Sequence, residues 1–122
     1  MEATAPTLSG STAAARQAAE KAIDQLEFCS DEAARMALIS AAATAVEAEA
    51  AERARDLGDA AEVEAAQMRA ELGAARAQAA AETTGRCLER AYQLTAEAQL
   101  ARARDDADTA DRAAAAADAW ER

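Results

Sequence analysis

Residues 54–63 read ARDLGDAAEV and decide the fold, because they place a helix end directly before a helix start. Gly58 suits the left-handed residue that follows a helix, since glycine adopts that conformation without steric strain. Asp59 is a good N-cap, and Glu62 three residues later resembles the acidic member of a capping box. We therefore expect one helix to end near Leu57, a second to begin after Asp59, and the chain to fold back as an antiparallel hairpin.

Rows of small apolar residues on either side of this turn support the hairpin. On the C-terminal side, the row follows steps of three and four from residue 63 to residue 101. Such a row marks one helix face, and a regular seam of this kind is typical of a helix that packs on another helix. A similar row runs from Ala19 to Leu57, with Glu47 as an interruption. The C-terminal row consists of Val63, Ala66, Ala70, Gly73, Ala77, Ala80, Thr84, Cys87, Ala91, Leu94, Ala98 and Ala101.

We expect an all-α fold in which an antiparallel long-helix hairpin and a short C-terminal helix form a bundle-like unit. The short helix would span residues 109–120, with Asp108 as its cap. Each long helix has one weak point, at Ser30 and at Gly85. Ser30 begins a cap-like run and Gly85 follows two threonines, so each point predicts either a kink or a break.

The chain divides into a short lead and one domain. Residues 1–11 hold the only proline and the first of four glycines, and they predict a disordered N-terminal lead. Residues 12–122 are then a single alanine-rich helical domain, which suits their length.

Alanine limits the core that this domain can build. It fills 43 of the 122 positions, and the hydrophobic fraction of 52% therefore leaves 20 larger apolar residues. A buried alanine contributes much less than the roughly 1.5–3 kcal/mol of a buried leucine or isoleucine. We expect closely spaced helices with an incomplete core, and a protein partner or a homo-oligomer that covers the remaining apolar surface.

Net charge narrows the classes of partner. The chain carries 23 acidic and 13 basic residues, for a net charge of −10. Nucleic acid and anionic membranes both require a basic face, so neither is an expected partner. Acids crowd the last part of the chain and indicate either a solvated helix face or a docking surface for a basic protein. Trp120 is expected to anchor either the last helix or a partner. The candidate interaction residues are Asp105, Asp106, Asp108, Asp111, Asp118 and Trp120.

Residue types that support catalysis are scarce. The chain has no histidine, which removes Ser-His-Asp and Cys-His arrangements and the Glu-x-x-His pair of ferritin-like di-iron sites. Its four isolated glycines do not form a glycine-rich phosphate loop. Carboxylates such as Glu20 and Asp24 alternate with alanine at helix spacing, which predicts a solvated face rather than acid–base chemistry. We expect no enzyme activity, no cofactor and no metal.

The two cysteines are the one pair that could carry side-chain chemistry. Cys29 and Cys87 lie 29 residues before and after Gly58, so an antiparallel hairpin brings them to the same level. They are expected to be two small buried residues, a disulfide across the hairpin, or a reversible redox pair. A reducing cytosol disfavours a structural disulfide, and two thiolates without histidine leave a zinc ion short of ligands.

The remaining signals concern location and function. The first residues do not resemble a signal peptide and no uncharged run reaches the length of a membrane span, so we expect a cytoplasmic protein. The bias toward alanine and arginine is typical of bacterial proteins from GC-rich genomes. The leading hypothesis is a non-enzymatic helical interaction or scaffold module that presents an acidic surface and can self-associate. The alternative is a thiol-based redox sensor that uses Cys29 and Cys87.

Overall fold

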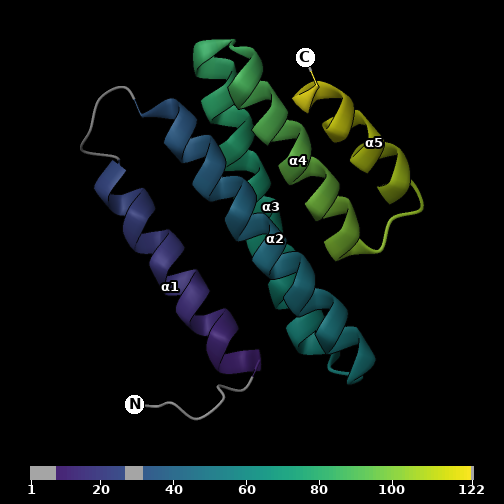
Figure 1. Cartoon of the computed structure of the whole chain (residues 1–122). Helices are drawn as coiled ribbons and strands as arrows, with labels where there is room; N and C mark the ends of the chain where they lie inside the picture. Colours follow the sequence, from purple (N-terminus) through teal and green to yellow (C-terminus); the bar gives the residue numbers. More distant parts are fainter. Residues whose placement is uncertain (1–7, 27–31, 122) are drawn as a thin grey trace.

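The computed structural model describes residues 8–26 and 32–121, which form five α-helices (Figure 1). The expected all-α, bundle-like fold is confirmed, and the described residues contain no strand. The first helix begins inside the stretch that we expected to be a disordered lead, and residues 1–7 of that lead lie outside the described residues. The helices are α1 (Leu8–Leu26), α2 (Ala33–Asp56), α3 (Ala60–Thr84), α4 (Cys87–Arg104) and α5 (Thr109–Trp120).

The turn at Gly58 forms as the sequence predicts. Gly58 has a φ of 72°, the left-handed value that glycine tolerates after a helix end. The N–H of Leu57 donates to the carbonyl of Arg53 at 3.1 Å and closes the last turn of α2. Beyond the glycine, Oδ1 of Asp59 accepts the N–H of Glu62 at 3.1 Å and caps α3. The helices α2 and α3 therefore pack as an antiparallel hairpin around this turn.

The weak point at Gly85 is a break rather than a kink. Gly85 has a φ of 65° and its N–H donates to the carbonyl of Ala81 at 2.8 Å, which ends α3. A left-handed residue turns the backbone out of the helical path, so α4 runs back along both α2 and α3 (Figure 1). The long second helix of the expected hairpin is therefore two helices. The weak point at Ser30 falls in residues 27–31, outside the described residues, and α1 and α2 on either side of it are separate helices.

Three helices form the core, and two flank it. The helices α2, α3 and α4 all pack against one another, whereas α1 packs on α2 and α5 packs on α4. In the view of Figure 1, α1 and α5 lie at opposite sides of the molecule. Two of the three core helices therefore carry a covering helix on their outer side.

Methyl groups line this core, as the composition predicts. The expected row is buried along α3 and α4, with Ala66, Ala70 and Ala77 among its fully buried members. The row fails at Cys87, which is exposed, because the break at Gly85 separates its two halves onto different helices. Among the residues described, Ile23 is the largest side chain with less than 2% exposure.

Gly73 marks a close approach of α2 and α3. A Cβ atom at this position would collide with Oγ1 of Thr44 and lie 3.3 Å from the carbonyl oxygen of Ser40. Thr44 is held in place because its hydroxyl donates to that same Ser40 carbonyl at 2.7 Å. The hairpin register predicts Ala43 opposite Gly73, and the residues found there are its close neighbours in α2. The absence of a side chain at Gly73 therefore sets the spacing of the hairpin.

We expect Gly73→Ala to lower the free energy of unfolding by up to about 2 kcal/mol. Overpacking of a tight contact costs roughly 1–3 kcal/mol, and alanine regains ~1 kcal/mol over glycine in a helix interior. Urea unfolding followed by circular dichroism measures the change. In a Thr44→Ala background, which removes the colliding oxygen, the cost should shrink. A Gly73→Ala chain that is more stable than the parent would contradict this contact.

Candidate functional site

Two of the predicted acidic residues lie in the turn between α4 and α5. Asp105 ends α4 in the left-handed conformation, with a φ of 59°. The end of α4 is fixed to the core, because Arg55 of α2 and Gln67 of α3 both donate to the carbonyl of Ala103. Asp105 and Asp106 are exposed at this fixed corner.

The other predicted acids lie along α5. Asp108, Asp111 and Asp118 recur at spacings of three and seven residues, which places them on one side of the helix. Asp111 and Asp118 are exposed, while Asp108 accepts a hydrogen bond from Nε of Arg112 at 2.9 Å. This hydrogen bond raises the pKa of Arg112. Within α5, Ala116 is the one buried residue, so the acidic side of the helix faces solvent.

Trp120 fixes α5 to α4. Its Nε1–H donates to Oγ1 of Thr95 at 2.8 Å, and the Thr95 hydroxyl in turn donates to the carbonyl of Ala91 at 2.9 Å. The indole also meets the ring of Tyr92 edge-on, with 4.7 Å between the ring centroids. Trp120 is nevertheless 45% exposed. Of the two roles expected for it, the contacts of this residue support the anchoring of the last helix.

The two cysteines cannot be compared in this structure. Cys87 is the first residue of α4 and is exposed. Cys29 falls in residues 27–31, outside the described residues. The pairing of the two thiols therefore stays a prediction.

An ion-pair network around one buried carboxylate was missed by the sequence analysis. Glu47, treated above as an interruption of an apolar row, has a side chain that is only 5% exposed. Arg16 of α1 donates to its two carboxylate oxygens at 2.6 and 2.7 Å, and Arg69 of α3 donates to it at 3.1 Å. Glu62 accepts from the same two arginines at 3.4 and 3.1 Å. The hydrogen bond to Glu47 raises the pKa of Arg16, and the network links three helices. An acid within an apolar row was the signal that could have indicated this burial.

Arginine–glutamate pairs also join the other helices. Arg102 of α4 donates to both carboxylate oxygens of Glu52 in α2, at 2.6 and 2.7 Å, and this lowers the pKa of Glu52. By contrast, the pair of Glu89 and Arg86 lies within the start of α4 and joins no second helix: buried Glu89 accepts from Arg86 at 2.6 Å, while its other oxygen has no hydrogen-bond partner among the described residues. Ion pairs with exposed members contribute about 0–1 kcal/mol each, so their main effect is to fix how the helices are aligned.

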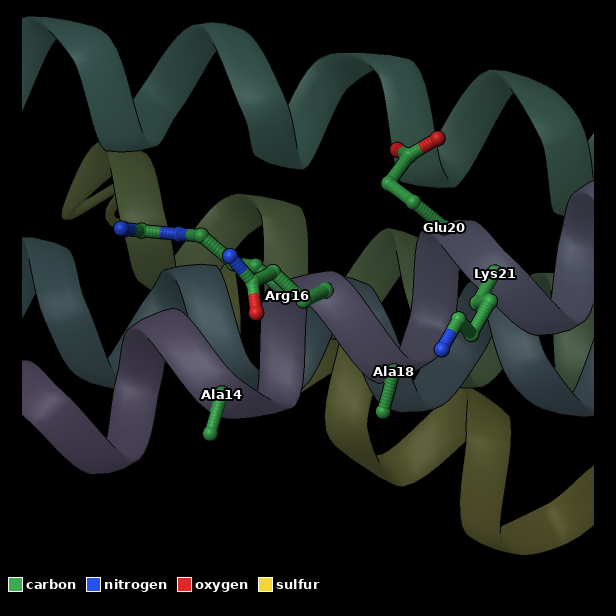
Figure 2. Close-up of a pocket in the computed structure, with 6 residues that line it drawn as sticks. Ala14, Arg16, Ala18, Glu20 and Lys21 are labelled. Carbon is green, nitrogen blue, oxygen red and sulfur yellow. The ribbon is translucent and has the colours of Figure 1, made fainter.

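The polar groups of the surface hollow on α1 do not point toward a common place, and Figure 2 shows Glu20 pointing away from Ala14, Ala18 and Lys21. A second hollow, between α1, α2 and α3, has ion-paired side chains and one leucine among its lining residues: Arg16, Glu20, Glu47, Arg69, Arg76 and Leu72. Over residues 8–26 and 32–121, no group of three or more cysteine and acidic side chains is placed to hold a metal ion. Over the same ranges, no helix combines the length and apolar character that a membrane crossing requires. The described residues that line the hollow on α1 are Ala14, Arg16, Gln17, Ala18, Glu20 and Lys21.

Comparison of the chain with models of protein families, with curated proteins and with solved structures found no match.

We expect Trp120→Ala to release α5 from α4. The change removes an edge-to-face ring contact and a hydrogen bond, each worth about 0.5–1.5 kcal/mol. Amide hydrogen exchange should become faster in α5 while exchange in α3 changes little, because α5 can open locally. Trp120→Phe keeps a ring and loses the hydrogen bond, so its exchange should be intermediate. Unchanged protection of α5 in the Trp120→Ala chain would show that other contacts hold this helix.

Proposed function

We propose that this chain is a non-enzymatic protein–protein interaction module that binds a basic partner protein through the acidic surface. We define the acidic surface as Asp105, Asp106, Asp111 and Asp118, on the α4–α5 turn and α5. One observation carries the proposal: exposed acids lie on elements that are firmly tied to the core. Arg55 and Gln67 hold the end of α4, and Trp120 holds the end of α5.

Rigid attachment matters for binding, because a surface that is already ordered loses less conformational entropy when a partner docks. The net charge affects how readily the chain and a basic partner meet. A chain with a net charge of −10 attracts a basic protein over distances of about a Debye length, which is roughly 8 Å at physiological salt. Binding through this surface should therefore weaken as the salt concentration rises. The proposal includes a cytoplasmic location, on the sequence grounds given above.

The test neutralises Asp105, Asp106 and Asp111 together as Asp→Asn. Asparagine tolerates the left-handed conformation of position 105, so the fold should persist. We expect proteins captured by the parent chain from a lysate of its own cells, and released by salt, to be lost with this variant. Quantitative mass spectrometry of the captured proteins measures the loss.

A matched control separates local charge from total charge. Glu49→Gln, Asp56→Asn and Glu82→Gln together remove the same three charges from exposed positions on α2 and α3. This control should retain the captured proteins. Equal loss with both triple variants, or no loss with either, would overturn the role of the acidic surface.

A second candidate function is the thiol-based redox sensor. The exposure of Cys87 at the start of α4 favours it, because an oxidant or another thiol can reach an exposed sulfur. Mild oxidation should then form the Cys29–Cys87 disulfide, with a loss of about two daltons for the two thiol hydrogens. The same treatment should change thermal unfolding, and Cys87→Ser should abolish both effects. An oxidised chain that unfolds like the reduced one would reject this function.

A further inference from the structure

Among the three core helices, α3 has an uncovered outer side. The helix α1 packs on α2 and α5 packs on α4, whereas the backbone of α3 packs on α2 and α4 within the described part of the chain and meets α1 through side chains, at the ion pairs Arg16–Glu62 and Arg76–Glu20. In Figure 1, α3 lies behind α2. The side of α3 that points away from α2 and α4 is therefore open to a partner, and α1 borders it along the edge that holds Arg69, Leu72 and Arg76.

This open side carries an apolar stripe, which we call the α3 stripe. Its residues follow steps of four and three, the spacing of positions a and d in a coiled coil. Its two central members, Met68 and Leu72, are 63% and 48% exposed, and they are two of the six large hydrophobic side chains exposed in the described structure. The buried seam of α3 falls at the b and f positions of the same heptads, on the opposite side of the helix. The α3 stripe consists of Ala61, Ala65, Met68, Leu72, Ala75 and Ala79.

The charges beside the α3 stripe are arranged for a second copy of the same helix. Position g holds Glu64 and Glu71, and position e holds Glu62, Arg69 and Arg76. In a parallel pair of helices, each g residue faces the e residue five positions later in the other helix. Glu64 then faces Arg69 of the second copy, and Glu71 faces Arg76 of the second copy. Twofold symmetry repeats both attractive pairs, which gives four in all.

The antiparallel alternative is less favourable on the same charges. In an antiparallel pair related by a twofold axis, position e of one helix faces position e of the other, and position g faces position g. Glu71 would then face Glu71 of the second copy and Arg69 would face Arg69, while the two pairs of Arg76 with Glu62 would be attractive. The repulsive pairs offset the attractive ones in this arrangement, so the charge pattern favours the parallel one, in which all four pairs are attractive.

We propose that the α3 stripe is the interface of a parallel homodimer, in which two copies of this chain pair through α3. The inference rests on the proposed function in one respect, since it names a second copy as a partner of the interaction module. Existing ion pairs are compatible with it. Glu71 accepts a hydrogen bond from Arg104 at 2.8 Å through Oε2, and a carboxylate can accept more than one such bond. Arg69 uses Nε and Nη2 for Glu47 and Glu62, and Arg76 uses Nη1 for Glu20, which leaves further guanidinium donors on each.

The dimer should be weak and concentration-dependent. The α3 stripe spans fewer than three heptads, and four of its six residues are alanine, which contribute little apolar area. Sedimentation equilibrium of the full chain should show the average mass rising with concentration from 12.6 kDa toward twice that value. A chain that is still monomeric at about 1 mM, which is near the dissociation constant of the weakest specific complexes, contradicts the homodimer.

Leu72→Glu tests the surface, and Leu38→Glu is its matched control. The two leucines are 48% and 46% exposed, on α3 and α2 respectively. Because a dimer contains the substitution twice, Leu72→Glu should raise the dissociation constant at least ~30-fold. Leu38→Glu should leave it unchanged, and circular dichroism should show that both chains keep their helices. Equal weakening by both variants overturns the assignment to α3.

Two further variants test the orientation. Glu64→Arg should weaken a parallel dimer about tenfold, because it turns two attractive pairs into repulsive ones. In an antiparallel dimer position 64 would face Gln78 instead, and the effect would be small. Ala75→Cys in a Cys29→Ser/Cys87→Ser chain should form an intermolecular disulfide on oxidation, since a parallel pair places position 75 beside its own copy. Failure of both results overturns the parallel arrangement.

These outcomes are independent of the test of the acidic surface. If the chain is monomeric, binding through Asp105, Asp106 and Asp111 is unaffected, because these residues lie on the α4–α5 turn and α5 and not on α3. Conversely, if the capture of partner proteins does not depend on those acids, sedimentation still decides whether the chain associates with itself through α3.

Discussion

Close contact between helix backbones is the constraint on which this structure depends. Alanine methyl groups fill little space, so α2 and α3 gain stability only where their backbones come close together. The contact at Gly73 shows the limit of this strategy, since a single added methyl group would collide with Thr44. A core of this kind has a precise spacing but little apolar area. Stability per residue must therefore be modest, and other interactions must fix how the helices are aligned.

Arginine–glutamate pairs supply that alignment. The buried carboxylate of Glu47 in α2 accepts hydrogen bonds from Arg16 of α1 and from Arg69 of α3, so it positions α1 and α3 relative to α2. The two-point pairing of Arg102 with Glu52 does the same for α4 and α2. The arginines around Glu47 offset the cost of removing its carboxylate from water, and both sets of pairs add little net stability, but their planar geometry is specific. They discriminate between alignments that a smooth alanine seam would leave nearly equal in energy.

Local signals in the sequence predicted the parts of the fold that local chemistry controls. The turn at Gly58, the cap at Asp59 and the buried row along α3 required only spacing and capping rules. Gly85 was ambiguous, because the choice between a kink and a break depends on whether α4 can pack back on α2 and α3. The burial of Glu47 was missed since its partner Arg16 lies 31 residues away in the chain. Of the candidate site, exposure of the acids was predictable, but the Trp120–Thr95 bond that orients α5 was not.

The two proposed surfaces place opposite electrostatic demands on the chain. A net charge of −10 favours a basic partner, but it also makes two copies repel each other at distances beyond their contact. Screening removes the long-range repulsion first, because the pairs across the α3 stripe act within a few ångströms whereas the net charge acts over the whole molecule. Moderate salt should therefore favour the homodimer while it weakens binding to the acidic surface. Ionic strength therefore distinguishes the two interactions, because the homodimer depends on charge pairs a few ångströms apart, whereas binding to the acidic surface depends on the long-range attraction of the net charge.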